Sequence, residues 1–456
     1  MRQGGTDVGP ELVRHPLVGH LLAFRRERLE LLDACIATPG DIVELRIRTP
    51  AYLLKRAEDV KHVLVVAESA YVKDERNIGA RATRIFGDGL MTSSGEAHRR
   101  MRRRVQPVFR RESMAPLADV IVRRVDAMAD RWEETAEIDL ADEMAGFALE
   151  TLMASIFGVE SGPELTAFEE GVIARRRSMT RGLASITTLP AFPPIALLPR
   201  RRRAIRELDE AIERMVRSRR NEGSARDDLL SMVMDAHEGE LSASDPRQVH
   251  DHALTFGLAA FENIARALTW SLLALSRHPD VEAKLRMEVQ RVLGDRAPRA
   301  DDCTNLRYTE MTVAESLRLW PPNALISRIA RRDDVLPTGR RIRAGSKLLL
   351  SPYVVHRDPT YYPDPQRFVP ERFSQEGKSG RPRYAYFPFG GGPRVCIGQT
   401  LAMMECTLVL ARVAQRVRLE LSGEPARYVC GCLPPGFGPT MRVRSLATGG
   451  RPSPAG

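Results

Sequence analysis

The stretch Phe387–Val413, FPFGGGPRVCIGQTLAMMECTLVLARV, places one cysteine just before an apolar segment with helical periodicity. The sulfur of Cys396 should therefore lie near a helix N-terminus, where the helix dipole and free N–H groups favour a thiolate. Four glycines flank this cysteine: Gly390, Gly391, Gly392 and Gly398. Glycine lets the backbone approach a flat partner and donate N–H groups to sulfur. Arg394 adds a cation that can pair with a carboxylate on that partner.

A single thiolate, with glycines that leave its surroundings free of side chains and with an arginine nearby, suits a haem iron better than zinc. Zinc takes more cysteine or histidine ligands. The alternative for Cys396 alone is a glycine-rich helix cap with an incidental buried cysteine. The complete pattern weakens that alternative, because it combines Phe389, Gly392, Arg394, Cys396 and Gly398.

A second motif lies upstream, in AESLRLW. Glu315 and Arg318 stand at positions i and i+3 of a predicted helix, where they can pair. Such a pair is common on exposed helices. Here the PERF segment follows, and its Arg372 offers a second guanidinium to Glu315.

In their order along the chain, the AESLRLW motif, the PERF segment and the cysteine loop resemble the cytochrome P450 family of the soluble bacterial type. The resemblance covers nearly the whole chain. It implies a mainly α-helical, triangular domain with a small antiparallel β-rich region. It also implies haem b, with Cys396 as the axial ligand of the iron and Phe389 and Gly398 in the same haem-binding signature. The residues Glu315, Arg318 and Arg372 would be structural and stabilise the core beneath the haem.

The same resemblance implies a clamp for the haem propionates. In GEAHRRMRRR, His98 and Arg102 lie at i and i+4 of a predicted helix that would reach these carboxylates. Arg394 and Arg328 would complete the clamp. Plain surface charge is the alternative for His98 and Arg102.

Composition favours one large domain. The chain has 456 residues, 43% of them hydrophobic, and no linker or repeat divides its interior. We expect a single haem domain over 11–447, with flexible ends at 1–10 and 448–456. The pattern predicts helices over 244–278, 280–294 and 308–320, and strands within 41–47, 51–56, 345–355, 417–421 and 440–446.

Charge and cysteine usage narrow the cellular setting. The net charge is +10, but no nucleic-acid-binding motif accompanies it, so we expect no nucleic acid partner. No sustained apolar run predicts a signal peptide or a membrane span. The six cysteines lack the spacing of a disulfide framework, which suits a cytoplasmic protein. We expect a monomer.

A monooxygenase also needs O2 and two electrons per turnover. The sequence has no flavin-binding or iron–sulfur module, so we expect a separate ferredoxin or flavodoxin with its reductase. An acidic partner would be steered by the basic residues around Arg103, Arg104, Arg110 and Arg111.

Family resemblance places substrate contacts in four regions: the loop 77–91, the proline-rich segment 185–198, the central helix and the segment 323–327. A turn near Pro435 would add a further contact. The expected wall of the substrate pocket is apolar, which favours a hydrophobic small molecule such as a terpenoid, polyketide or fatty-acid-like compound of secondary metabolism. Each wall residue could equally be core packing. The residues are Phe256, Ala259, Ala260, Phe261, Leu325, Ile326 and Phe437.

The central helix departs from the family pattern. Glu262 keeps the acid that the family uses in proton delivery to dioxygen, but Asn263 stands where a threonine is usual and Ala260 replaces a glycine. A hydroxyl can relay a proton, whereas an amide cannot readily do so. Asn263 therefore orders a water, binds a polar group of the substrate, or only satisfies a helix carbonyl.

The predicted function is a haem-thiolate monooxygenase that oxidises a hydrophobic small molecule, with Glu262 and Asn263 as the catalytic pair. Two other interpretations stay open. One is a P450-fold peroxygenase, isomerase or dehydratase that needs no reductase. The other is a non-catalytic haem-binding protein.

Overall fold

The computed structural model describes residues 19–47, 49–74, 83, 86–172, 199–222, 228–238, 246–423 and 438–446. The chain forms two compact units, and each is described by itself. The first unit draws its described residues from Met1–Glu75 and Ala314–Cys396. The second draws them from Arg76–Val313, Ile397–Ala426 and Leu433–Gly456. The prediction of a single domain over 11–447 stays a prediction.

The first unit is built on a five-stranded sheet in the order β1-β2-β8-β5-β3, and β6 pairs with β7 separately. Only β2 and β8 are parallel in this sheet. In the β1-β2 hairpin, Val43 faces Leu53 and Leu45 faces Ala51, and all four side chains are buried. This period-two burial is what the alternating sequence predicts. The strands are β1 (Ile42–Ile47), β2 (Thr49–Leu54), β3 (Tyr71–Val72), β5 (Ile326–Ala330), β6 (Asp334–Val335), β7 (Arg341–Ile342) and β8 (Lys347–Leu350).

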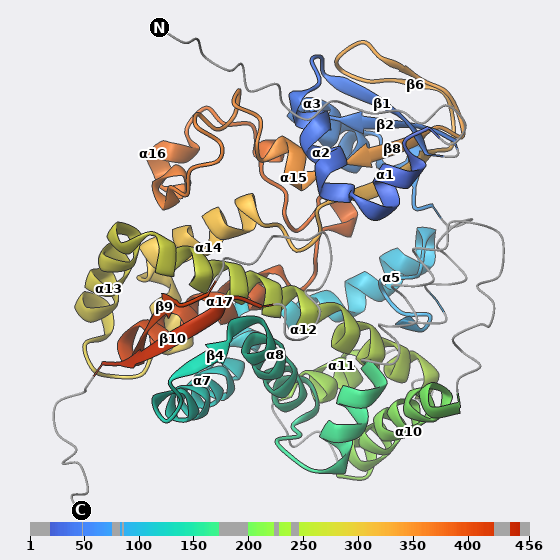
Figure 1. The fold of residues 1–456 in the computed structure, drawn as a ribbon. Coiled ribbons are helices and arrows are strands. Elements are labelled where there is room, and N and C mark those ends of the chain that lie inside the picture. Colours follow the sequence, from blue (N-terminus) through green and yellow to red (C-terminus); the bar gives the residue numbers. More distant parts are fainter. Residues whose placement is uncertain are drawn as a thin grey trace, which may run out of the picture. The chain divides into compact units, whose positions relative to one another are not determined.

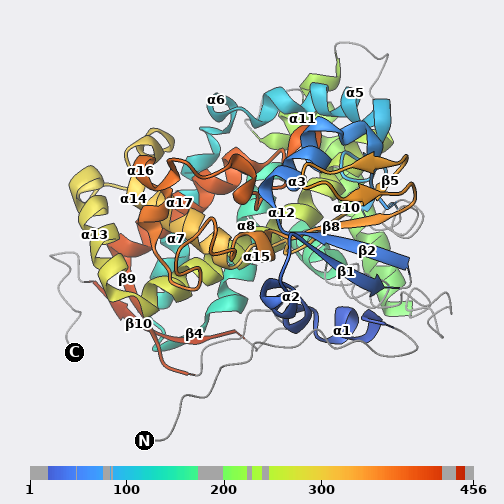
Figure 2. The same cartoon turned by 90° about the horizontal axis from the view of Figure 1, so that it is seen from above.

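Helix α2 packs its Leu32 and Cys35 into the same apolar cluster as the β1-β2 hairpin, and Figure 1 and Figure 2 both show α2 close to these strands. The sequence pattern predicts a strand through PYVV, but this segment instead forms α15. Pro352 occupies its first turn and the Ser351 hydroxyl accepts the Val354 N–H, so the strand ends at Leu350. The helical segments are α1 (Leu21–Arg26), α2 (Arg28–Ala37), α3 (Ala57–Lys61), η1 (His62–Val66), η2 (Glu68–Ala70), α15 (Pro352–Val355), η7 (Pro370–Phe373), α16 (Gln375–Lys378), η8 (Arg383–Ala385) and η9 (Gly392–Arg394).

The second unit is helical around one long central helix, α12 (Pro246–Arg277), which packs along α8. A three-stranded antiparallel sheet in the order β4-β10-β9 belongs to this unit. Its other elements are α5 (Gly95–Val105), η4 (Gln106–Phe109), α6 (Arg111–Met114), α7 (Leu117–Glu133), β4 (Glu137–Asp139), α8 (Leu140–Phe157), α10 (Pro199–Glu222), α11 (Leu229–Glu238), α13 (Pro279–Leu293), η6 (Ala300–Thr304), α17 (Gln399–Arg416), β9 (Val417–Leu421) and β10 (Thr440–Ser445). Helix α14 (Arg307–Leu319) runs from this unit into the first.

Proline positions set the ends of the central helices. α12 starts at Pro246, and its last residue, Arg277, precedes the His278-Pro279 pair. Proline suits the first turn because its missing N–H would have no partner there, and it restricts the residue before it. Pro279 then starts α13. These ends confirm the predicted helices, although residues 244 and 245, expected as the N-cap of α12, lie outside the described residues.

Candidate functional site

The cysteine loop is a compact turn that ends the first unit. The Cys396 N–H donates to the Phe389 carbonyl at 2.9 Å, and the Val395 N–H donates to the Gly392 carbonyl at 3.1 Å. Phe389 is half-buried, while Cys396 is exposed and forms no disulfide. Helix α17 begins at Gln399, with Gly398 as its N-cap. Cys396 therefore immediately precedes a helix N-terminus in the chain, as the sequence predicts.

The glycines of this loop fall into two classes. A Cβ on Gly392 would stand 1.9 Å from the Leu64 carbonyl oxygen, and a Cβ on Gly391 would stand 2.4 Å from the Tyr384 ring. Gly392 also has a positive φ of 65°. These two glycines are therefore required by protein packing. Gly398, by contrast, has no atom of the described residues within 4 Å of the point where a Cβ would stand, so packing among those residues does not require a glycine here.

Arg394, in the cysteine loop, interacts electrostatically with Arg328. Burial, together with the charge of Arg394, lowers the pKa of Arg328 to about 10, although Glu68 acts in the opposite direction. Arg328 lies on β5 and donates to the carbonyl of Ser327 at 2.9 Å. Two neighbouring guanidinium groups repel each other unless an anion lies near both. The pair therefore fits a carboxylate-bearing cofactor, as propionates of haem would provide.

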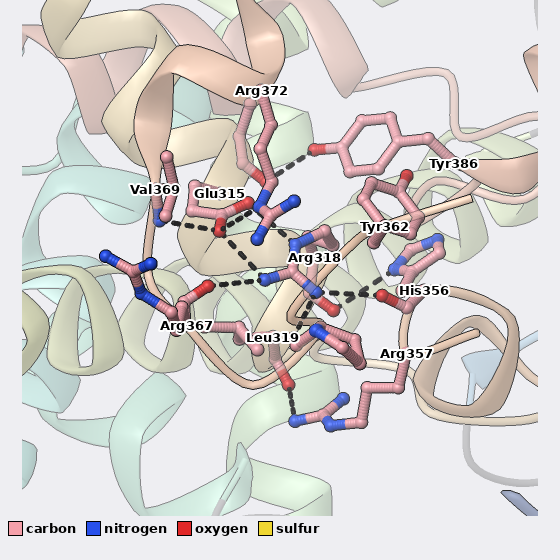
Figure 3. A network of polar contacts seen from close by, with 12 residues as sticks. Glu315, Arg318, Leu319, His356, Arg357, Tyr362, Arg367, Val369, Arg372 and Tyr386 are labelled. Carbon is pink, nitrogen blue, oxygen red and sulfur yellow. Dashed lines mark hydrogen bonds and ion pairs between the residues drawn. The ribbon is translucent and has the colours of Figure 1, made fainter. Parts of the chain in front are cut away.

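A fully buried ion pair lies in the same unit (Figure 3). Arg318 binds both oxygens of Glu315, at 2.7 and 2.8 Å, and neither side chain is exposed. The Val369 N–H donates to Glu315 at 2.8 Å, and Arg372 Nε lies 3.5 Å from Glu315 Oε1. The three predicted residues are thus brought together. Arg318 also donates to three carbonyl groups, those of His356, Pro365 and Arg367.

His356 belongs to this network, although its sequence context indicates only a packing residue at a strand end. Its ring is fully buried, its Nε2 accepts the Phe387 N–H at 2.9 Å and its Nδ1 lies 3.2 Å from the Arg318 carbonyl oxygen. Burial, reinforced by the charge of Arg318, holds its pKa well below the usual range. Tyr386 stacks on the ring and donates to the Ala314 carbonyl. His356 thus connects the buried ion pair to the segment that enters the cysteine loop, a contact that no spacing in the sequence reveals.

The centre of α12 carries the second candidate pair. Glu262 accepts from Arg266 at 3.0 Å, one turn later on the same helix, and both side chains are largely buried. The Asn263 amide nitrogen donates to the Ala259 carbonyl at 2.6 Å. This bond is the third of the roles considered for Asn263, satisfaction of a helix carbonyl. It uses one donor of the amide, and the water and substrate roles concern its other polar positions.

The residues predicted to form the wall of the substrate pocket differ in burial and in packing. Ala259 and Ala260 are half-buried on α12, whereas Phe261 is buried. Phe256 packs edge-on against Phe109 at 5.4 Å and stacks on His252 at 5.8 Å, which is a core environment. In the first unit, Leu325 and Ile326 are half-buried beside the sheet clusters. Pro435, Phe437 and the segment 185–198 lie outside the described residues, as does most of the loop 77–91.

Helix α5 carries the predicted residues for the propionates in the second unit. His98 is buried and Arg102 is half-buried. Arg103, Arg110 and Arg111 are exposed. The assignment of His98 and Arg102 to the propionates stays a prediction, with His98 the more deeply buried of the two.

Comparison with known proteins identifies the family. A family model described as Cytochrome P450 matches residues 9–428. Cyclooctatin synthase from Streptomyces melanosporofaciens is 37% identical over 89% of this chain and 88% of its own. Pentalenene oxygenase from Streptomyces avermitilis is 31% identical over 89% of this chain and 90% of its own. The crystal structure of the cytochrome P450DA heme domain superposes with a TM-score of 0.84 at 25% identity, covering 96% of this chain and 98% of that one.

The chain belongs to the cytochrome P450 family. It is a haem-thiolate oxidoreductase of the monooxygenase class with haem b as its cofactor. The predicted fold, mainly helical with small antiparallel sheets, is confirmed. Among the described helices, none is both long enough and apolar enough to cross a membrane.

Proposed function

We propose that this P450 inserts an oxygen atom into a hydrophobic terpenoid. The observation that carries the proposal is similarity over 89% of the chain to proteins whose names specify an alkene, pentalenene, and an alkenol, cyclooctat-9-en-7-ol. Both substrates named there are hydrocarbon skeletons with at most one hydroxyl group. The apolar side chains of Ala259 and Ala260 support the same class, because a hydrocarbon is held by shape rather than by polar anchors. A polyketide or fatty-acid-like substrate is the second candidate class.

In this proposal the Cys396 thiolate would hold the haem iron, and the bound haem would supply the oxygen activation. The family resemblance assigns the propionates to Arg328 and Arg394 of the first unit and to His98 and Arg102 of the second, each of which would bind a carboxylate by charge-assisted hydrogen bonds. Phe389 holds the loop through its carbonyl bond to the Cys396 N–H. The thiolate is favoured by the helix N-terminus that follows it in the chain.

On α12, Glu262 would take part in passing protons towards the reaction site, and Asn263 would position the group that passes them on. Arg266 holds the Glu262 carboxylate in place between proton transfers, because its guanidinium lies only 3.0 Å away. Asn263 then orders a water or a polar substrate group with the amide positions that its bond to Ala259 leaves available. This arrangement replaces a hydroxyl relay by an ordered molecule.

Titration of the purified haem protein with a panel of compounds tests the substrate class. Cyclic terpene alkenes and alkenols should shift the haem spectrum at lower concentrations than fatty acids or polyketide mimics of similar size. Turnover with NAD(P)H, a surrogate reductase and ferredoxin is then compared with turnover by peroxide alone. Product from peroxide only would support a peroxygenase, and no product from any tested ligand would support a non-catalytic binding protein.

For electron supply we propose a separate acidic ferredoxin or flavodoxin that is steered by the exposed arginines Arg103, Arg110 and Arg111. Attraction between opposite charges is screened within about 10 Å at 0.1 M salt, so reduction should slow as salt rises. The double variant Arg110→Glu/Arg111→Glu should slow association roughly 10-fold or more at low salt. Arg291→Glu on α13 is the control, because it removes one exposed positive charge from a different helix. Reduction rates that are indifferent to ionic strength would refute the steering.

A further inference from the structure

The chain changes its helical winding close to the cysteine loop. Helix α3 continues directly into η1 (His62–Val66), a π-helical turn in which the Ala67 N–H donates to the His62 carbonyl at 2.8 Å. Such wide turns are rare and occur mostly as single turns, frequently at functional sites. The sequence gives no signal for it, since DVKHVLVV is compatible with an ordinary helix.

This π-turn lies against the cysteine loop. The carbonyl of buried Leu64 faces Gly392 so closely that a Cβ on Gly392 would stand 1.9 Å from its oxygen. The Leu64 side chain also reaches Gly391, where a Cβ would stand 3.2 Å from Leu64 Cδ1. Gly391 and Gly392 immediately precede Pro393 and Arg394. A shift of the π-turn would therefore be transmitted to the backbone that presents Cys396.

A polar triad holds the start of the π-turn. His62 Nε2 lies 2.8 Å from Asp334 Oδ2, and the Tyr71 hydroxyl donates to the same oxygen at 2.7 Å. The Val335 N–H donates to the other carboxylate oxygen at 2.8 Å. Burial alone would raise the pKa of Asp334, but the hydrogen bonds from His62 and Tyr71 outweigh it and lower that pKa. The three side chains come from the π-turn, β3 and β6.

A second contact fixes the helix just before the turn. The fully buried Asp59 on α3 accepts from the Thr338 hydroxyl at 2.8 Å and from the Thr338 N–H at 3.2 Å. Thr338 follows β6 by a few residues, so Asp59 and His62 bind the same stretch of chain. The N-terminal half of the turn is thus anchored to the β6-β7 hairpin, while its middle residue contacts the cysteine loop.

We infer that His62, Asp334 and Tyr71 are positioning residues for the cysteine loop, acting through the π-turn and Leu64 on Gly391 and Gly392. None of them reaches Cys396 in the described contacts. Their effect is on how the loop presents the sulfur and its neighbouring N–H groups to the iron. This inference rests on the proposed role of Cys396 as the iron ligand.

The test uses full-length haem-loaded protein and three variants: His62→Phe, Asp334→Asn and Tyr71→Phe. The readouts are the midpoint reduction potential of the haem and the ratio of thiolate-ligated to thiol-ligated forms in the ferrous carbon monoxide spectrum. Tyr353→Phe is the matched control, because it removes one tyrosine hydroxyl bond, to Asp33 at 2.9 Å, in the same unit but away from the loop. Thermal unfolding of all four variants is measured alongside.

His62→Phe and Asp334→Asn should increase the thiol-ligated fraction several-fold and shift the potential, with Tyr71→Phe smaller in the same direction. The control should change neither readout, even where its unfolding temperature falls equally. Parent-like spectra and potentials in all three triad variants would overturn the inference. If one variant does not fold, the other two decide the test. Tyr71→Phe is the mildest of the three, because it removes only a hydroxyl group. A parent protein without any thiolate-ligated form would instead refute the role of Cys396.

Discussion

Two glutamate–arginine pairs, each on one helix, differ in how deeply they are buried. In the first unit, Glu315 and Arg318 are fully buried, and backbone carbonyls and an N–H group take the remaining polar positions. In the second unit, Glu262 and Arg266 keep exposed fractions of 13% and 15%. The neighbouring Asn263 engages its own helix through one N–H group.

In the proposed function, this difference in burial separates a structural pair from a chemical one. A polar network with every partner supplied by the protein fixes one conformation, and any change leaves a buried group unsatisfied. A pair with part of its surface open can exchange protons with water or a substrate. Residue type alone does not distinguish the two cases, because both are a glutamate and an arginine within one helical turn.

The largest effect on stability is expected for the fully buried pair, Glu315 and Arg318. Arg318→Met and Glu315→Leu should each lower the free energy of unfolding by about 3–5 kcal/mol, because each strands an uncompensated buried charge. Chemical denaturation of the haem-loaded protein measures this loss. The double variant should recover little, since the carbonyl groups of His356, Pro365 and Arg367 would still lose their donors. Full recovery in the double variant would show that only the charges matter.

Much of this architecture could be predicted from the sequence. Proline and helical periodicity predict the bounds of α12 and α13 to within a few residues, and the order of motifs indicates the family. The pairing of Glu315 with Arg318 is also predictable, because the two share a helix face, whereas the approach of Arg372 is implied only by the order of the family motifs. Local rules suffice where the partners are close in the chain.

The rest depends on contacts between distant segments. His356 meets Phe387 and Arg318 only after folding, and His62, at the start of the π-turn, contacts Asp334 far along the chain. The sequence pattern assigns Gly392 to a flat partner, but its neighbour in the structure is the Leu64 carbonyl. A glycine shows that space is needed without showing what fills it.

The next largest effect is expected at Asn263, beside the Glu262–Arg266 pair, and it concerns the reaction rather than folding. Asn263→Ala should leave haem binding intact but divert reducing equivalents from product to hydrogen peroxide, with a loss of product of roughly 10²-fold or less. Coupling efficiency and substrate-binding spectra measure this. Asn263→Thr should keep much of the activity if the amide orders water, and should lose substrate affinity if the amide binds substrate.

The contrary outcome for Asn263 is equally specific. If both variants match the parent in product yield and affinity, the bond to the Ala259 carbonyl is the whole role of the amide. The comparison between the two pairs would then rest on Glu262 alone.

A smaller effect on stability sharpens the contrast. Glu262→Gln should lower the free energy of unfolding by less than Glu315→Leu does, because the amide oxygen of glutamine can still accept a hydrogen bond from Arg266. It should nevertheless reduce product formation and increase the solvent isotope effect on turnover, since the amide cannot supply the proton. Arg266→Gln is the matched control, which breaks the same pair but keeps the acid. A loss of stability as large as that for Glu315→Leu would remove the distinction between the pairs.

The smallest effect is a pH dependence of stability with opposite signs at two histidines. On α12, burial would lower the pKa of His250, but Asp209 and Asp251 outweigh it and raise this pKa to about 9. Its contribution is therefore complete below the unfolded pKa of about 6.5 and is lost as pH rises through about 9. His356 has a lowered pKa, so its burial costs stability as pH falls below about 6.5.

Thermal unfolding from about pH 5 to pH 10 separates the two histidines, because each is compared with its own variant. The stability lost in His250→Gln should be largest near about pH 6 and should shrink towards about pH 10, because the neutral imidazole no longer attracts its carboxylates. His356→Gln should behave oppositely: its deficit relative to the parent should narrow as the solution becomes acidic, since the variant has no ring to protonate. Parallel pH profiles for the parent and His250→Gln would show that the ion pairs of His250 contribute nothing measurable to the folded state.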